Sequence, residues 1–415
     1  MEMRPPSQKR LQAAKALNQL VLRFYQECLE ARAKGKPVGW MPPMNGAIEI
    51  FYAMDLQPVF PENWSPLCAA FGYAPQNFRV AEALGYSRDL CGYLRNIVGY
   101  VHGLMKEGGT PLALPEPDLL LSFGGGCVPA MKIFHILEDR FPEARIFSAD
   151  LPQVAAEQVQ DHHVRYAVSE MHRLIDFLTK TTGKKLDYDR LQEVVDLSNQ
   201  ASILWDEIMA YRRYIPSPFS AAEIGIMFVM VTRQGTREAV DFLTQVRDEV
   251  AARSENKVGV IEEEQVRLFW DNIPPWYNLG LLKSFEKMNG VVVAETYSSA
   301  WSIRLDGDDP IEALARKSLL SYSLVSCVSI KKRKENVLKA CREYAIDGAI
   351  LHRNKSCAPI TLGQMDIKRA LEEELGIPSV IIDGDHMDER NFSLAQFQTR
   401  TEAFMEMLKH KKGLW

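Results

Sequence analysis

Three widely spaced cysteines are the residues of this chain whose chemistry is most informative. Cys91 lies in GYSRDLCGYLRN, Cys127 in SFGGGCVPAMK, and Cys357 in HRNKSCAPITLGQMDI. No pair of cysteines has the close spacing typical of zinc ribbons or ferredoxins, so local spacing predicts no metal motif. The alternative is that the three are small buried hydrophobic residues, and spacing alone favours that interpretation.

Cys127 and Cys357 each follow an apolar run of strand length. In the N-terminal part such runs alternate with helical patterns, and after residue 258 the alternation returns. This pattern predicts an α/β fold with mostly parallel sheets in two domains. The expected strands are KPVGWM at 36–41 and the runs 56–60, 119–123, 145–149, 266–270, 290–296, 348–352 and 379–383.

Between these two parts, residues 155–255 show no strand pattern. Apolar residues there keep the spacing of one buried helix face, with a stop at Gly183 and a restart at Asp187. We therefore predict an N-terminal α/β domain with a leading helix at 1–155, a helical insertion or hinge at 156–258, and a C-terminal α/β domain with a closing helix at 259–415. For the insertion, a purely scaffolding role is the favoured interpretation.

Ligands of open α/β sheets gather beyond the carboxyl ends of the strands, so Cys127 and Cys357 can meet in a cleft between the domains. A third thiolate, Cys91 at a helix start, would complete three corners of a cube. Three protein ligands leave one iron of a four-iron cluster open to water or a substrate oxygen, as a catalytic cluster requires.

Four segments in the same order resemble the family of 2-hydroxyacyl-CoA dehydratase and benzoyl-CoA reductase subunits. They are PENW at Pro61–Trp64, SRDLC at Ser87–Cys91, the strand and GGGC ending at Cys127, and the KSCAPITLGQMDI run around Cys357. The resemblance extends from roughly residue 35 to 385. It implies two flavodoxin-like domains with a [4Fe-4S] cluster between them, bound by Cys91, Cys127 and Cys357 and with one iron open to water or substrate.

The resemblance also implies partners and an activity. The partners are a related cluster-bearing subunit, a separate ATP-hydrolysing iron-sulfur activator and a CoA-thioester substrate. The chain has no GxxxxGK[ST] loop, in agreement with ATP being handled elsewhere. The implied activity is an oxygen-sensitive, ATP-driven, low-potential one-electron reduction of the thioester, in which an open iron would stabilise developing negative charge.

Within this family, the PENW segment and DNIPPWYNL at Asp271–Leu279 favour the benzoyl-CoA reductase type, which reduces an aromatic ring. The direct alternative is an (R)-2-hydroxyacyl-CoA dehydratase subunit that eliminates water through a ketyl radical. An alternative of another class is a non-catalytic electron-transfer or structural cluster subunit. A further alternative is a metal-free nucleotide-binding α/β protein.

Both family reactions need a proton donor or acceptor, and two residues are candidates. Glu62 lies in PENW after the second expected strand, and His352 lies at the end of a strand, five residues before Cys357. The alternatives are that Glu62 caps a helix and that His352 is a hydrogen-bonded core histidine.

Composition narrows the class of protein further. The net charge of -5 provides no basic field for a phosphate backbone, so nucleic acid is not an expected partner. No apolar run reaches the length of a signal peptide core or a membrane span, so we expect a protein without membrane contact. The seven cysteines indicate reduced thiols, and we therefore expect the protein to be cytoplasmic. Of the other cysteines, Cys28 and Cys341 are predicted packing residues, and Cys68 and Cys327 have no assigned role.

Two further motifs give weaker signals. The glycines at 124–126 lack the spacing of a dinucleotide loop, and close approach of the backbone to a cluster or thioester explains them equally well. The KKRK run at Lys331–Lys334 is interpreted as a solvated helix face, with CoA phosphates or an acidic partner as alternatives.

Overall fold

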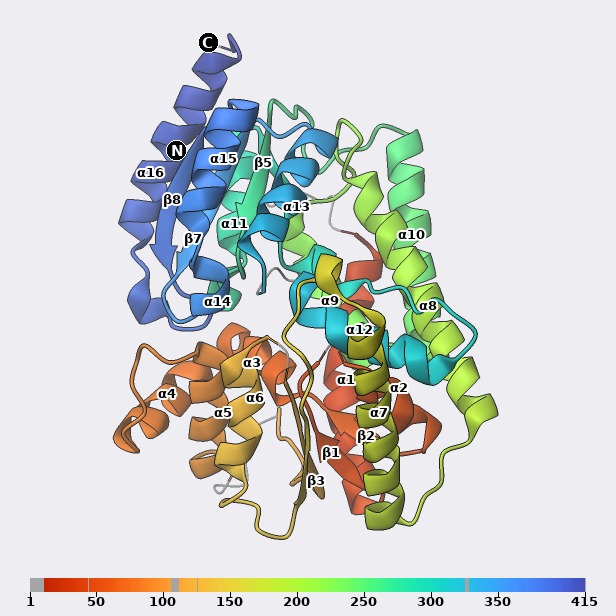
Figure 1. The fold of residues 1–415 in the computed structure, drawn as a ribbon. Helices are drawn as coiled ribbons and strands as arrows, with labels where there is room; N and C mark the ends of the chain where they lie inside the picture. The colour runs from red at the N-terminus through yellow and green to blue at the C-terminus, as the bar shows by residue number, and fades with distance from the viewer. Residues whose placement is uncertain (1–10, 44, 106–111, 125, 325–327, 415) are drawn as a thin grey trace.

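The structure is a computed structural model of the chain that describes residues 11–43, 45–105, 112–124, 126–324 and 328–414. Figure 1 shows an N-terminal sheet with its helices in the lower part of the molecule and a C-terminal sheet with its helices at the upper left. A group of long helices stands on the right and spans both parts.

The N-terminal sheet has four parallel strands in the order β2-β1-β3-β4. They are β1 (Val38–Trp40), β2 (Gln57–Val59), β3 (Leu119–Phe123) and β4 (Arg145–Ala149). Every residue of β3 is buried, as its continuous apolar run predicts for a strand covered on both faces. The helices are α1 (Ala13–Ala33), α2 (Ala47–Ala53), α3 (Pro61–Ala70), α4 (Ala74–Ala83), α5 (Gly92–His102) and α6 (Val128–Leu137).

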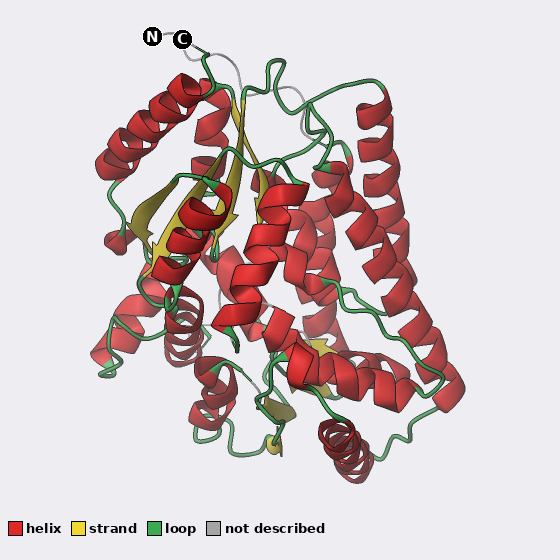
Figure 2. Ribbon diagram, turned by 45° about the horizontal axis from the view of Figure 1, so that its top comes forward, coloured by secondary structure: helices red, strands yellow, loops and turns green. Residues whose placement is uncertain are grey.

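The C-terminal sheet repeats this design with four parallel strands in the order β6-β5-β7-β8. They are β5 (Val266–Asp271), β6 (Gly290–Glu295), β7 (Gly348–Asn354) and β8 (Ser379–Gly384). Separate apolar clusters cover its two faces, and Figure 2 shows helices on both sides of the strands. The predicted α/β class with two parallel sheets is therefore confirmed. The helices are α11 (Gly280–Lys283), α12 (Pro310–Leu324), α13 (Ile330–Glu343), α14 (Ala358–Thr361), α15 (Gln364–Leu375) and α16 (Leu394–Lys411).

Between the sheets in sequence lie α7 (Asp161–Thr182), α8 (Tyr188–Tyr211), α9 (Met227–Thr232) and α10 (Arg237–Glu255). Gly183 has a positive φ of 72° and ends α7, and the Asp187 carboxylate accepts a hydrogen bond from the Arg190 amide at the start of α8. Helix α12 packs on α7, and α1 packs on α9 and α10, so helices from all three predicted segments share one core. The domain boundaries at 155 and 258 therefore remain a proposal.

Short 3-10 helices lie between these elements, at Ala156–Gln158, Ala221–Ile226, Trp276–Asn278, Ser284–Met288, Ser298–Trp301 and Glu389–Asn391. The PENW segment begins α3 with Pro61 in its first turn, which suits a proline because that position needs no amide hydrogen bond. No helix in the described part of the chain has the length and apolar character needed to cross a membrane.

A buried ion pair ties the N-terminal sheet to the long helices. Lys317 on α12 and Glu49 on α2 are at most 1% exposed, and their Nζ and Oε1 atoms are 2.6 Å apart. Ser198 on α8 donates a hydrogen bond to the same carboxylate oxygen at 2.8 Å. A buried carboxylate without its cation is costly because the protein interior solvates charge poorly.

We predict that Lys317→Met lowers the free energy of unfolding by about 3–5 kcal/mol, because it leaves Glu49 charged and unpaired in the core. The neighbouring Arg316→Met is the control, since Arg316 forms an exposed ion pair with Glu312 and its loss should cost under about 1 kcal/mol. Urea unfolding measures both values. Equal effects of the two substitutions would contradict the role given to Lys317.

Candidate functional site

The two sheets place their strand ends toward one another in equivalent ways. In each sheet the chain moves to one side of the first strand and then crosses to the other side, so β1 and β3, and likewise β5 and β7, flank a topological switch point. Cys127 begins α6 directly after β3, and Cys357 begins α14 directly after β7. Figure 1 shows α14 facing α3 and α5 across the boundary between the two sheets.

Each of the three predicted site cysteines stands at the N-cap of a helix, Cys91 on α5, Cys127 on α6 and Cys357 on α14. All three are partly exposed, whereas Cys28, Cys68 and Cys341 are buried and pack in the core. The packing roles predicted for Cys28 and Cys341 are therefore confirmed. Cys327 lies outside the described residues.

The three thiols and Glu62 are close enough to influence one another's ionisation. Burial raises the pKa of Cys127 well above its usual range, and Glu62, Cys91 and Cys357 raise it further. Burial also raises the pKa of Cys91 to about 12, with added contributions from Glu62 and Asp385. Because these acidic groups oppose each other's ionisation, a thiolate here needs a positively charged partner.

The cysteines at this site suit an iron-sulfur cluster better than a single metal ion. Among the described residues, no three His, Cys, Asp or Glu side chains are gathered closely enough to share a single metal ion. In an iron-sulfur cluster each thiolate binds a different iron, so its ligands stand further apart. Backbone amides at the helix starts, from Tyr93 and Leu94 for Cys91 and from Ala130 for Cys127, favour the thiolate form. Three such thiols fit a cluster with three protein ligands.

Glu62 lies in the first turn of α3, directly beyond the carboxyl end of β2. Glu62 as a whole is half-buried, and the burial of its carboxyl raises its pKa to about 7. A group with that pKa gains and loses a proton readily near neutral pH, as a general acid or base must. The structure brings Glu62 together with Cys91 and Cys127, while its proton-transfer role stays a prediction.

In cluster-free protein we predict that Glu62→Gln gains stability relative to wild type as the pH rises. Between the unfolded value of 4.5 and the folded pKa of about 7, the folded chain holds a proton on Glu62 that the unfolded chain has lost, so rising pH destabilises the wild type. The difference in free energy of unfolding should grow by about 2 kcal/mol between about pH 5 and about pH 8. Urea unfolding at both values measures it, and exposed Glu138→Gln is the control. A pH-independent difference would contradict the shifted pKa.

His352, the other predicted proton-transfer residue, is 2% exposed within β7. Its Nδ1–H donates to the Ile273 carbonyl at 2.7 Å, and its ring lies beside Trp270 at a centroid distance of 5.5 Å. Burial lowers its pKa. These are the contacts of a hydrogen-bonded core histidine, which is the alternative stated for it, and its catalytic role stays a prediction without added support.

The loop after β8, residues 385–388, is part of the site region that sequence reasoning missed. The Asp385 carboxylate accepts hydrogen bonds from the Met387 and Asp388 amides at 2.9 and 3.0 Å, which fixes a tight turn. The His386 carbonyl accepts from the Trp276 amide at 2.9 Å. This loop follows a predicted strand, so the rule that ligands gather beyond strand ends could have found it.

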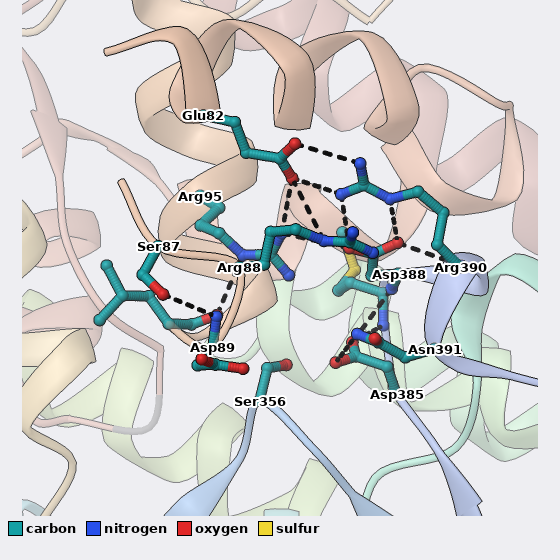
Figure 3. A network of polar contacts seen from close by, with 12 residues as sticks. Glu82, Ser87, Arg88, Asp89, Arg95, Ser356, Asp385, Asp388, Arg390 and Asn391 are labelled. Carbon is teal, nitrogen blue, oxygen red and sulfur yellow. Dashed lines mark hydrogen bonds and ion pairs between the residues drawn. The ribbon is translucent and has the colours of Figure 1, made fainter. Parts of the chain in front are cut away.

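Arg95 on α5 joins this loop to the segment that carries Cys91 (Figure 3). Its Nη1 lies 3.2 Å from Asp388 and 3.5 Å from Glu82, and its Nε donates to the Leu90 carbonyl at 3.0 Å. Arg390 pairs with the same two carboxylates, Glu82 and Asp388. Because Arg95 is fully buried, this network fixes the backbone next to Cys91 relative to the C-terminal sheet.

We predict that Arg95→Met lowers the free energy of unfolding by about 3 kcal/mol and raises hydrogen exchange in the 87–91 backbone, because the Leu90 carbonyl loses its buried donor and Asp388 keeps only the more exposed Arg390 as its partner. Exposed Arg88→Met, on the same segment and 4.0 Å from Glu82, should change neither quantity measurably. Unchanged exchange in Arg95→Met would show that other contacts hold the Cys91 segment.

The KKRK run is only partly a solvated helix face, so the prediction for it is wrong at one position. Lys331 is exposed, but Arg333 is 1% exposed and forms an ion pair with Asp271 at 2.6 Å. Arg333 also donates to the Ile360 and Leu362 carbonyls, so it holds α14 just after Cys357. Helix periodicity puts one residue in three or four of such a run on the buried face.

The fold and site define a protein with two doubly wound parallel sheets and a cysteine-lined site between their strand ends. Residues 44–408 match the family model for the 2-hydroxyglutaryl-CoA dehydratase D-component, and the chain belongs to this family. An (R)-phenyllactyl-CoA dehydratase alpha subunit from Clostridium sporogenes is 29% identical over 97% of both chains. An (R)-2-hydroxyisocaproyl-CoA dehydratase alpha subunit from Clostridioides difficile is 28% identical over 97% of this chain and 98% of its own. A benzoyl-CoA reductase subunit from Thauera aromatica is 28% identical over 80% of both chains.

Proposed function

We propose that this chain is the cluster-bearing subunit of an oxygen-sensitive (R)-2-hydroxyacyl-CoA dehydratase. The observation that carries the proposal is the meeting of three N-cap thiols with Glu62 between the strand ends of two parallel sheets. The sequence favoured the benzoyl-CoA reductase type. The nearly full-length relatives named above are dehydratase alpha subunits, so we place dehydration first and ring reduction second.

In this proposal, Cys91, Cys127 and Cys357 hold a [4Fe-4S] cluster. When bound, the cluster supplies a low-potential electron and a Lewis-acidic iron open to water or substrate. The helix N-termini that begin at these cysteines direct amide dipoles toward the negative charge of the thiolates. Glu62 accepts or returns the proton that the reaction moves, since its pKa of about 7 suits either direction.

The proposal also includes partners and a location. The relatives are themselves named as subunits, of dehydratases and of a reductase, which supports a second, related subunit in the assembly. We propose that a separate ATP-hydrolysing activator delivers the electrons and that the substrate is a CoA thioester. A cytoplasmic location would keep the thiols reduced.

Iron and acid-labile sulfide per chain, measured after anaerobic purification, test the cluster. We expect about four of each in the wild type and a large loss in Cys91→Ala, Cys127→Ala and Cys357→Ala, because each variant lacks one thiolate ligand. The matched control is Cys341→Ala, a buried cysteine on α13 that should keep its iron.

Iron-free wild-type protein that is folded, or iron content indifferent to the three substitutions, would overturn the assignment and favour a metal-free nucleotide-binding protein. Four protein ligands on a bound cluster would favour an electron-transfer subunit instead. With partner and activator supplied, parallel assays on (R)-phenyllactyl-CoA and benzoyl-CoA separate dehydration from ring reduction.

A further inference from the structure

His386 is a buried imidazole that lies between the segments carrying two of the site cysteines. It is 0% exposed, and its ring meets Tyr93, two residues after Cys91, edge to face at 4.4 Å. On the other side, its Nδ1 lies 3.4 Å from the hydroxyl of Ser356, which precedes Cys357. The mechanism proposed above gives this residue no role.

The hydrogen bonds of His386 fix which ring nitrogen carries the proton. Its own backbone N–H points to Asn354 Oδ1 at 3.3 Å, and a backbone amide can only donate, so that Asn354 atom is the oxygen. The same oxygen lies 3.0 Å from His386 Nδ1, which therefore must donate as well. Burial lowers the pKa of His386 to about 4, so the neutral ring carries its one proton on Nδ1.

This tautomer leaves Nε2 as a hydrogen-bond acceptor without a partner among the described residues. A buried acceptor without a donor is costly, and native structures rarely leave one unsatisfied. Gly92 packs closely against this edge of the ring, since a Cβ at that position would lie 3.4 Å from His386 Cε1 and 2.6 Å from Met387 Cβ. The structure thus holds an acceptor fixed beside the residue that follows Cys91.

We propose that His386 Nε2 accepts a hydrogen bond from the 2-hydroxyl group of the acyl-CoA, which makes His386 a specificity-determining residue. This inference rests on the proposed function. A neutral imidazole acceptor needs an O–H or N–H donor, and the thioester carbonyl and sulfur offer none. Within the acyl group, the 2-hydroxyl is the hydrogen-bond donor, and it stands on the carbon next to the reacting carbonyl carbon.

The test compares binding of two probes that differ only in this hydroxyl, (R)-phenyllactyl-CoA and 3-phenylpropionyl-CoA. Calorimetry uses the full-length chain, purified anaerobically. We expect the wild type to bind the hydroxylated ester roughly 10-fold more tightly, the effect of one buried hydrogen bond. In His386→Asn, which keeps a donor to Asn354 but has no atom at the Nε2 position, the ratio should fall to about one.

Two further variants separate this role from a structural one. His386→Gln places a polar group near the Nε2 position and should retain part of the ratio, whereas His135→Asn, on the exposed face of α6, should keep all of it. In ¹⁵N-histidine spectra, the Nε2 signal of His386 should shift on addition of the hydroxylated ester and not of its deoxy analogue.

A wild-type ratio near one, or a ratio that His386→Asn leaves unchanged, would overturn this inference while leaving the proposed function intact. Failure to bind either ester would overturn the proposed function, and the inference would fall with it. Because the two failures differ in the binding of the deoxy ester, one titration series distinguishes them.

Discussion

The buried ion pair between Arg95 and Asp388 is the constraint on which the site geometry depends. It joins residues 293 positions apart, one on α5 of the N-terminal part and one in the loop after β8. The same guanidinium donates a hydrogen bond to the Leu90 carbonyl, so Arg95 contacts both the loop after β8 and the backbone before Cys91. The ring of Phe78 lies 4.4 Å from the guanidinium and excludes water from the pair.

On the opposite side of the site, the buried Arg333 holds α14 in place, as Arg95 holds the segment before α5. It binds Asp271 at the end of β5 and the carbonyls that follow Cys357, and Gln364 donates to the same Asp271 oxygen at 2.9 Å. The segments that carry Cys91 and Cys357 are therefore each anchored by a buried arginine rather than by the cysteine itself. The thiols can then face one another despite mutual repulsion of their ionised forms, because folding does not rely on them.

Much of the fold followed from the sequence because parallel strands buried on both faces appear as continuous apolar runs. The run LLLSF forms β3 with the predicted bounds, and Gly183 and Asp187 mark the end of α7 and the start of α8 as predicted. These signals are local, so neighbouring residues suffice to detect them. The resemblance to a known family, rather than spacing, selected the three cysteines.

The rest of the site depends on contacts between distant segments, which a single sequence does not display. Arg333 looked like part of a solvated basic run until its partner Asp271 was known. His352 and His386 both stand near strand ends, but His352 points into the sheet core toward Trp270, while His386 follows its strand and reaches the start of α5. Only the relative placement of the two sheets shows which of the two histidines lies beside the start of α5.

The distribution of the cysteines along the chain has a consequence for biosynthesis. Cys91 and Cys127 emerge from the ribosome long before Cys357, and the helices that share their core come between. A cofactor that needs all three thiols cannot be completed on the N-terminal sheet alone, so its insertion must follow the docking of the last sheet. Once inserted, it would close a loop of more than two hundred residues and act as a covalent brace between the two halves.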